Sequence, residues 1–389
     1  MRAPTAAAAV AAAAVAARLA RGRDRPPALT APPRNRPAEP VSVVIPARDE
    51  EHRIRACAVP LLADPAVREV IVVDDRSRDG TARTAAALGA TVVAGTEPPA
   101  GWVGKQWALR QGLRRARGPL VVLLDADTRP KEGLCTALAG LLEECDLVSA
   151  GPRFLTGSAV EQALHASLLA TLVYRFGPVG PDARGPGRLL VNGQCLAFRK
   201  DAMVRADAFA RVRGHLTDDV ALGRLLARDG WRVAFVDAGA LLEVDMHGGV
   251  ADVWREWGRS IALRDVTPPA GLAGDLAVVW LTMALPVLRL LSGRPAPLDL
   301  ALLGQRFLLT AALRGSYAAP GPGLLLSPLL DPVGAVRLTL SVLRPARTWR
   351  GRVYARDATG PPGRRAPRRR ADGAAVRARP GPPARSGHR

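Results

Sequence analysis

Three acidic motifs constrain the fold of this chain more than any other feature of its sequence. Asp74-Asp75 follows a run of Val and Ile, Asp125-Ala126-Asp127 follows a second aliphatic run, and Asp218-Asp219 precedes a helical stretch. A short aliphatic strand that ends in Asp places carboxylates at the carboxyl edge of a sheet, where open α/β folds bind their ligands. The motifs therefore predict an α/β fold with several carboxylates along one sheet edge.

The order of the apolar runs predicts a Rossmann-like, nucleotide-binding sheet in the first half of the chain. Expected strands alternate with expected helices: strands at 41–46, 69–73, 91–94, 120–124 and 146–150, and helices near 50–63, 79–88, 105–117 and 131–144. Short β-branched runs between helices are typical of a parallel sheet covered on both faces. The G-x-G-x-x-G turn of dinucleotide enzymes is missing, which argues against an NAD-binding domain.

The next part of the chain is more mixed, and we expect it to form the second wall of a cleft. It holds an apolar helix over 159–176, an extended segment over 188–198 and a helix over 218–228 that begins with the third acidic motif. Two further strands are expected at 231–236 and 241–246, followed by a Trp-containing helix over 250–263.

Cysteine and histidine spacing excludes the common metal frames. Cys57, Cys135, Cys145 and Cys195 form no CxxC or Cys/His pattern, which predicts buried thiols in a reducing compartment and no disulfide frame or zinc site. The histidines are scattered, and His52, His165, His215 and His247 are interpreted as local hydrogen-bonding groups. A His-based metal site is not expected.

The net charge of +20 does not indicate a nucleic-acid partner. Much of the excess lies in the Arg/Pro-rich tail at 355–389, and a basic tail beside a membrane segment attracts anionic lipid headgroups. The six Phe and three Tyr offer little base stacking, and the chain contains no recognisable nucleic-acid module.

Apolar segments after residue 270 predict a small membrane-embedded helical bundle over 270–345. The segments 272–291, 298–313 and 324–343 are each interrupted or bracketed by charged residues or proline, which we expect at helix ends or facing partner helices. A soluble helical subdomain is the alternative. Residues 1–40 are Ala-, Arg- and Pro-rich, and their Ala run is expected to form a frayed helix or weak membrane anchor, because Ala is nearly neutral on insertion scales.

Four motifs resemble the family 2 glycosyltransferases of the GT-A fold. They are VSVVIPARDEE (41–51), VIVVDDRSRDGT (70–81), DADT (125–128) and LTDDVALGRLLARDGWRV (216–233), and the resemblance covers most of 41–265. It implies a nucleotide-sugar donor, a divalent cation (Mg²⁺ or Mn²⁺) on the donor diphosphate and a late acidic pair that supplies the base. The residues that the resemblance assigns are Pro46 and Glu50 at the donor pocket, Asp75 on the nucleobase, Asp125 at the sugar nucleotide, Asp127 at the metal, and Asp219 as base beside Asp218.

The chain departs from the family in two places. Asp218-Asp219 replaces the usual Glu-Asp, and the Gln-x-x-Arg-Trp motif of processive members is absent, with WREWGRS (254–260) in its region. GWVGKQWAL (101–109), NGQ (192–194) and WRGRVY (349–354) resemble the branch associated with hopanoid and carotenoid glycosylation. Lys105, at an expected helix N-terminus, would add positive charge beside a phosphate.

Each motif also has a purely structural interpretation. Asp74 and Asp218 can cap helices, and Asn192 and Gln194 can be loop hydrogen-bonders instead of acceptor or donor contacts. Trp257 could anchor the chain at a membrane interface or contact the acceptor. The joint occurrence of the acidic motifs on one alternating scaffold favours the functional interpretation.

The sequence therefore predicts a membrane-associated inverting glycosyltransferase that acts on a lipid hydroxyl of terpenoid type, with its catalytic domain on the cytoplasmic side of the cell membrane. An even number of crossings would keep the basic tail on that side, with 324–343 re-entrant. Transfer to a polyprenyl phosphate, a sugar nucleotidyltransferase and a non-catalytic nucleotide-binding scaffold remain open alternatives.

Overall fold

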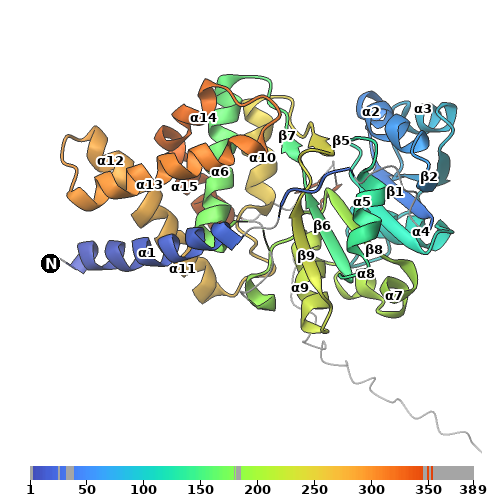
Figure 1. Cartoon of the computed structure of the whole chain (residues 1–389), viewed down its shortest axis with the longest axis horizontal. Coiled ribbons are helices and arrows are strands. Elements are labelled where there is room, and N and C mark those ends of the chain that lie inside the picture. The colour runs from blue at the N-terminus through green and yellow to red at the C-terminus, as the bar shows by residue number, and fades with distance from the viewer. Residues whose placement is uncertain are drawn as a thin grey trace, which may run out of the picture.

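An α/β half and a helical half lie side by side in this protein (Figure 1). The computed structural model describes residues 3–24, 27–31, 39–178, 180, 185–344, 348–349 and 352–353. The predicted tail at 355–389 and half of the motif at 349–354 (residues 350, 351 and 354) lie outside these residues.

The central sheet has seven strands in the order β3-β2-β1-β4-β8-β6-β9. Their bounds are β1 (Val41–Ala47), β2 (Val67–Asp74), β3 (Thr91–Ala94), β4 (Leu120–Leu124), β6 (Leu147–Gly151), β8 (Cys195–Arg199) and β9 (Val233–Asp237). β1 to β4 pair in parallel, as expected. β8 lies between β4 and β6 and runs antiparallel to both, so the parallel arrangement is interrupted by a strand from the second half of the chain.

Alternation along the strands divides the core into two apolar layers, one on each face of the sheet. In β1, Val43 and Ile45 face one layer and Val44 faces the other, and all three are fully buried. The first layer is completed by α2 (Glu51–Leu62), α3 (Thr81–Ala87) and α5 (Leu134–Leu141). The second is completed by α4 (Gly104–Arg115), α7 (Lys200–Arg205), α8 (Ala208–Arg211) and α9 (Asp218–Arg228). Because both faces are covered, the central strands β1 and β4 are apolar and buried along almost their whole length.

A second, three-stranded sheet supports the end of β4. It has the order β5-β10-β7, formed by β5 (Thr128–Pro130), β10 (Leu242–Val244) and β7 (Arg153–Phe154). Only β10 had been expected from the sequence, because it lies within the run at 241–246, whereas no strand-like run surrounds β5 or β7. The Asp245 amide donates to the Asp127 carbonyl at 2.9 Å, so this sheet holds the second acidic motif in place.

The helical half is assembled around α6 (Ala159–Phe176), the green helix of Figure 1. Most residues of α6 are buried, because it contacts helices from both ends of the chain. These partners are α1 (Ala3–Ala20), α10 (Val250–Ser260), α11 (Pro269–Val279), α13 (Pro297–Leu313), α14 (Pro322–Leu326) and α15 (Asp331–Leu343). The Ala-rich N-terminal segment is therefore a packed helix, with Val15 fully buried, and not a frayed one. The other alternative, a weak membrane anchor, stays a prediction.

Two helices are long and apolar enough to cross a membrane by length and composition. Pro269–Leu291 comprises α11, a π-helical turn η3 (Trp280–Ala284) and α12 (Leu285–Leu291), and Pro322–Leu343 comprises α14, η5 (Ser327–Leu330) and α15. The π-helical turn lies just before Pro286, which has no N–H to donate within a regular helix. Of the three predicted segments, the middle one, α13, is not among these two helices. Length and composition do not test whether the third segment is re-entrant or interfacial, as we expected, so that stays a prediction.

Two charged residues of the apolar segments, Arg306 and Asp331, are buried and paired with each other, as expected. Arg306 of α13 donates to Asp331 of α15 at 2.8 and 3.1 Å, and Ser167 of α6 donates to the same carboxylate at 2.9 Å. The outer face is apolar: Leu291, Leu308 and Leu325 are 71%, 74% and 64% exposed. Leucines that far exposed are costly in water and suit a lipid environment.

Candidate active site

The residues predicted for the donor side line one small cavity at the carboxyl ends of β1, β2 and β4. The cavity measures about 60 Å³, and its lining includes Pro46, Glu50, Asp75, Lys105, Asp125 and Asp127. Parallel strands end at the same sheet edge, so residues far apart in sequence meet there. The sequence prediction that these residues come together is correct.

Glu50 and Asp75 are held by neighbours on the same edge. The Glu50 amide donates to Thr81 Oγ1 at 2.8 Å, and Arg53 Nη1 donates to Glu50 Oε2 at 3.3 Å. Arg48 Nη1 donates to the Asp75 carbonyl at 3.0 Å and lies 3.9 Å from its carboxylate. Both acidic side chains are buried and partly neutralised by arginines that the sequence analysis did not identify.

Lys105 forms a close ion pair with Asp125. Its Nζ lies 2.6 Å from Oδ1 and 2.8 Å from Oδ2, and α4 begins at the preceding residue, as the GWVGK motif predicted. Burial lowers the pKa of Lys105, but the carboxylates of Asp125, Asp218 and Asp219 outweigh it and hold the pKa above its usual value. Lys105 is therefore a permanent positive charge at the end of β4.

A much larger cavity, of about 790 Å³, opens from the same point. Lys105, Asp125 and Asp127 line both cavities. The remaining predicted site residues, Asn192, Gln194, Asp218, Asp219 and Trp257, line the large one. Every site residue predicted from the sequence thus lines one or both of these two adjoining cavities.

The segment 192–194 connects Asp125 to the late acidic pair. The Gln194 carbonyl accepts from the Asp125 amide at 3.0 Å, and the Gly193 amide donates to Asp219 Oδ2 at 2.8 Å. Asn192 and Gln194 hydrogen-bond each other at 2.9 Å through their side chains. Their main contribution is therefore to shape this loop, while Gln194 Nε2 is buried with no partner among the described residues.

Gly193 was not predicted as a site residue, yet it fixes the position of Asp219. A Cβ at position 193 would lie 2.8 Å from Asp219 Cβ and 3.1 Å from Oδ2. Asp219 Oδ1 also accepts from the Val220 amide at 2.8 Å. Two backbone donors thus orient this carboxylate, and only glycine lets the loop approach it so closely.

The two carboxylates at the start of α9 differ in their surroundings. Burial raises the pKa of Asp218 to about 7, with Lys105 opposing and Asp219 reinforcing the shift. Burial also raises the pKa of Asp219, but Lys105 and the backbone amides of Val220 and Gly193 oppose it. The helix N-cap is Thr217, without a side-chain capping hydrogen bond, so neither Asp218 nor Asp219 occupies the N-cap position.

The part of the large cavity's wall that comes from α6 and α13 is mostly apolar, whereas α10 contributes the charged residues Asp252, Arg255, Glu256 and Arg259. The apolar side chains come from α6, α13 and the segment after α10, and they include Leu169, Leu172, Val173, Leu309, Leu313 and Ile261. A space with carboxylates at one end and aliphatic side chains along the other fits a ligand with a polar end and an apolar body.

His247 and Trp257 are unsatisfied polar groups on this wall. His247 is 7% exposed and Trp257 is 9% exposed, and neither ring nitrogen of His247 nor Trp257 Nε1 has a partner among the described residues. The neighbouring His165 bonds Tyr317 Oη at 2.8 Å, as a local hydrogen-bonder should. That interpretation is wrong for His247, and Trp257 is buried too deeply to be an interfacial anchor.

Metal-binding side chains are few at this edge. Within the described part of the chain, no three His, Cys, Asp or Glu side chains are arranged to hold a metal ion by themselves. Asp125 and Asp127 nevertheless offer hard carboxylate oxygens at the junction of the two cavities. Mg²⁺ is commonly held by one or two carboxylates together with phosphate oxygens of a substrate, so this donor set fits such a cation.

A family model described as Glycosyl transferase family 2 matches residues 42–205. These residues form a family 2 glycosyl transferase domain. The match begins in β1 and ends in α7, so it includes the small cavity, the DAD motif and the 192–194 loop but not the late acidic pair.

Similar proteins include the 4,4'-diaponeurosporenoate glycosyltransferases of Staphylococcus aureus strains USA300 and Newman. Each is 39% identical over 88 residues, which is 22% of this chain and 24% of the relative. The matched stretch thus spans about a quarter of the length of these relatives.

Among solved structures, the mannosyltransferase PcManGT from Pyrobaculum calidifontis in complex with GDP-Man and Mn2+ matches with a TM-score of 0.55 and 19% identity. The match covers 88% of this chain and 98% of the mannosyltransferase. Glucosyl-3-phosphoglycerate synthase from Mycobacterium tuberculosis, in complex with phosphoglyceric acid, matches with a TM-score of 0.38 and 25% identity over 58% of this chain and 78% of the synthase. The first likeness confirms the predicted GT-A fold.

Proposed function

We propose that the protein is a membrane-associated, inverting glycosyltransferase that moves a sugar from a nucleotide sugar to a hydroxyl group of a terpenoid lipid. The observation that supports this most is the meeting of two unlike cavities at Lys105, Asp125 and Asp127. The small cavity, with Glu50, Asp75 and Lys105 on its wall, would hold only part of a nucleotide diphosphate, because it measures about 60 Å³. The large cavity, of about 790 Å³, has room for the rest of the donor and for an acceptor with an apolar body. The reacting groups would meet where the cavities join.

On the donor side, Asp75 would hydrogen-bond the nucleobase, with Pro46 and Glu50 forming the floor of the pocket. Asp125 would contact the sugar nucleotide, and Lys105 would lie beside the phosphates as a fixed positive charge. The Lys105 ion pair with Asp125, at 2.6 Å, supports this role because it keeps both groups oriented before the donor arrives.

Asp127, with Asp125, would hold a divalent cation on the donor diphosphate. The mannosyltransferase with the similar fold is in complex with Mn2+ and GDP-Man, and the carboxylate oxygens of this chain suit Mg²⁺ or Mn²⁺. When bound, such a cation would stabilise the negative charge of the departing nucleotide diphosphate. Lys105 is a second positive charge on the same side.

Asp219 would remove the proton from the acceptor hydroxyl. The Gly193 and Val220 amides fix its carboxylate and favour its ionised form, while each oxygen keeps a further lone pair for the acceptor. Asp218, whose pKa lies near 7, would tune the charge of the pair. A base on the side opposite the leaving nucleotide gives inversion in a single displacement.

The acceptor would lie along the apolar wall between α6 and α13. That wall belongs to the helical half whose outer leucines are exposed, so an apolar molecule could reach the site from a membrane without crossing water. The partial likeness to glycosyltransferases named for a carotenoid acid supports a terpenoid acceptor. His247 and Trp257, which have no protein partner among the described residues, would bind a polar group of the acceptor.

Membrane association would rest on the two long apolar helices. Two crossings would leave the domain that precedes them and the basic tail that follows on the same side, and the positive charge of that tail favours the cytoplasmic face.

The decisive experiment incubates the purified full chain with UDP-, GDP- and dTDP-linked sugars and with polyisoprenoid alcohols in detergent, and analyses the lipids by mass spectrometry. A hexose attached to the alcohol with an inverted anomeric centre is expected. Transfer confined to a polyprenyl phosphate would favour that acceptor instead. Pyrophosphate release from a sugar 1-phosphate and NTP, or nucleotide binding without any turnover, would contradict glycosyl transfer.

A further inference from the structure

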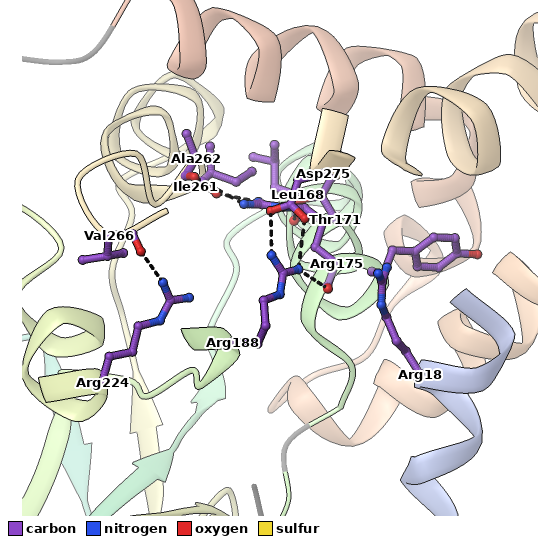
Figure 2. A network of polar contacts seen from close by, with 11 residues as sticks. Arg18, Leu168, Thr171, Arg175, Arg188, Arg224, Ile261, Ala262, Val266 and Asp275 are labelled. Atoms are coloured by element: carbon purple, nitrogen blue, oxygen red, sulfur yellow. Dashed lines mark hydrogen bonds and ion pairs between the residues drawn. The ribbon is translucent and has the colours of Figure 1, made fainter. Parts of the chain in front are cut away.

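Four arginines from distant parts of the chain meet where the helical half contacts α9, and none of them lines either of the two cavities. Arg18 of α1, Arg175 of α6, Arg188 of the short helix η2 (Pro186–Arg188) and Arg224 of α9 form this arginine cluster (Figure 2). Among the described residues, Asp275 of α11 is the carboxylate that forms ion pairs with it, to Arg175 at 3.1 Å and to Arg188 at 3.0 Å. Positive charge therefore exceeds negative charge in the cluster.

Part of the cluster has a structural role. Arg175 donates to the carbonyls of Ile261 and Ala262 at 2.6 and 3.3 Å in addition to its ion pair. Arg188 donates to the Arg175 carbonyl at 2.6 Å. These bonds fasten α6 to α11 and to the end of α10, and they explain why Arg175 and Asp275 are buried together.

Arg224 is not explained in this way. It is 2% exposed, its Nε and Nη1 donate to the carbonyls of Leu189 and Val266 at 3.0 and 2.6 Å, and its Nη2 has no partner among the described residues. Carbonyl oxygens satisfy hydrogen bonds but do not neutralise a full charge. A buried guanidinium with an unused donor and no ion-pair partner is costly, unless an anion completes the site.

The surroundings increase that cost. The guanidinium carbons of Arg175, Arg188 and Arg224 lie 4.9, 4.1 and 5.9 Å from the centre of the Phe176 ring, so three cations gather around one aromatic ring. The ring attracts each of them but does not cancel their charges. Burial lowers the pKa of Arg224 to about 10, and repulsion from Arg188 and Arg228 adds to the shift. A bound anion would relieve both effects.

The position of the cluster indicates where an anion would come from. Asp275 belongs to the Pro269–Leu291 helix, which is long enough to cross a membrane. Arg18 lies near the end of α1, and α1 packs against that helix. The Arg188 side chain remains 32% exposed, which leaves a route to the cluster. This is the junction between the apolar helices and the transferase domain. With the membrane association proposed above, on which this inference rests, lipid headgroups would lie at this level.

We propose that the arginine cluster binds a phosphate group, supplied by the headgroup of an anionic membrane lipid. A phosphate offers several acceptor oxygens to the planar donor pairs of arginine, which a single carboxylate cannot match. The lipid would tie α1, α9 and the first long helix together at the membrane surface. The site is separate from the donor cavity, and its occupancy does not depend on glycosyl transfer.

The test uses the full chain in detergent micelles and counts bound lipids by native mass spectrometry during titration with phosphatidylglycerol or phosphatidylcholine. Wild-type protein should retain more phosphatidylglycerol than phosphatidylcholine. Arg224→Gln and, independently, Arg188→Gln should each weaken that binding by about 10- to 100-fold, the usual effect of losing one charge-assisted hydrogen bond. Arg188→Lys keeps the charge but loses the planar pair of N–H donors. Its affinity for phosphatidylglycerol should therefore lie between those of wild type and Arg188→Gln. Circular dichroism checks that each variant is folded.

Arg232→Gln is the matched control, because Arg232 is 62% exposed and pairs with Asp146 on the far end of β9. It should bind phosphatidylglycerol like wild type. Equal retention of the two lipids by wild type, or unchanged binding in folded Arg224→Gln and Arg188→Gln proteins, would overturn the proposal. Competition by inorganic phosphate at the same concentration as the lipid would overturn the lipid source. Because no turnover is measured, a negative result leaves the glycosyltransferase proposal unaffected.

Discussion

Replacing Gly193 by Ala tests whether a backbone contact sets the activity of this enzyme. The new methyl carbon would lie 2.8 Å from Asp219 Cβ and 3.1 Å from its Oδ2. Non-bonded carbons prefer about 3.5–4.0 Å, so loop and carboxylate must separate by roughly 1 Å. The 2.8 Å hydrogen bond from the Gly193 amide to Asp219 would then be lost.

The expected loss of turnover follows from that displacement. A hydrogen bond to a charged group contributes about 1.5–3 kcal/mol, and a misplacement of about 1 Å at a reacting group can cost about 10²-fold. Transfer to the acceptor should therefore fall roughly 10- to 100-fold in kcat. Donor affinity should change little, because the small cavity does not include Gly193. A radiolabelled-sugar transfer assay and nucleotide titration calorimetry measure the two quantities.

Two controls separate this effect from general damage. Gly140→Ala adds a methyl group with nothing within 4 Å, so turnover should stay at the wild-type level. In an Asp219→Asn background, Gly193→Ala should add almost nothing, because both changes act on the same carboxylate. Turnover of Gly193→Ala within twofold of wild type, or full additivity with Asp219→Asn, would refute the reasoning.

Further predictions concern the carboxylates and the acceptor wall. Asp127→Asn should abolish most turnover while the fold survives, and undiminished turnover in EDTA would remove the metal role. Asp219→Asn should lower kcat by about 10²–10⁴-fold with donor binding preserved, and Asp218→Asn should be milder; the reverse order would exchange their roles. Turnover should decline as the pH falls below about 7, because the Asp218-Asp219 pair gains a proton and loses its basic form. Asp218→Asn removes a like charge and should move this decline to lower pH, as a pH–rate profile would show. His247→Phe should raise KM for the acceptor and leave slow donor hydrolysis unchanged, and an unaltered acceptor KM would contradict a binding role for that ring.

The sequence by itself determined the α/β scaffold and the residues of the acidic edge. Strands β3 and β4 and helices α6 and α9 have the predicted bounds, because local hydrophobic periodicity and helix-start signals are properties of neighbouring residues. Carboxylates at the ends of parallel strands lie at the same edge of the sheet, so the sequence alone predicted that Asp75 and Asp125 lie close together.

Only the tertiary structure decided which distant segments complete the site. The insertion of β8 between β4 and β6 brings the 192–194 loop next to Asp125 and Asp219, and no local pattern specifies that pairing. The helix α6, which looks like an ordinary core helix in sequence, packs against the apolar helices and also contacts α9, where Phe176 and Leu172 lie against Val220. It therefore connects the two halves, whose apolar cores are separate. His247 and the arginine cluster became visible only when every buried donor could be matched with a partner. Hydrogen-bond satisfaction depends on contacts between residues far apart in the chain, and a sequence pattern does not record them.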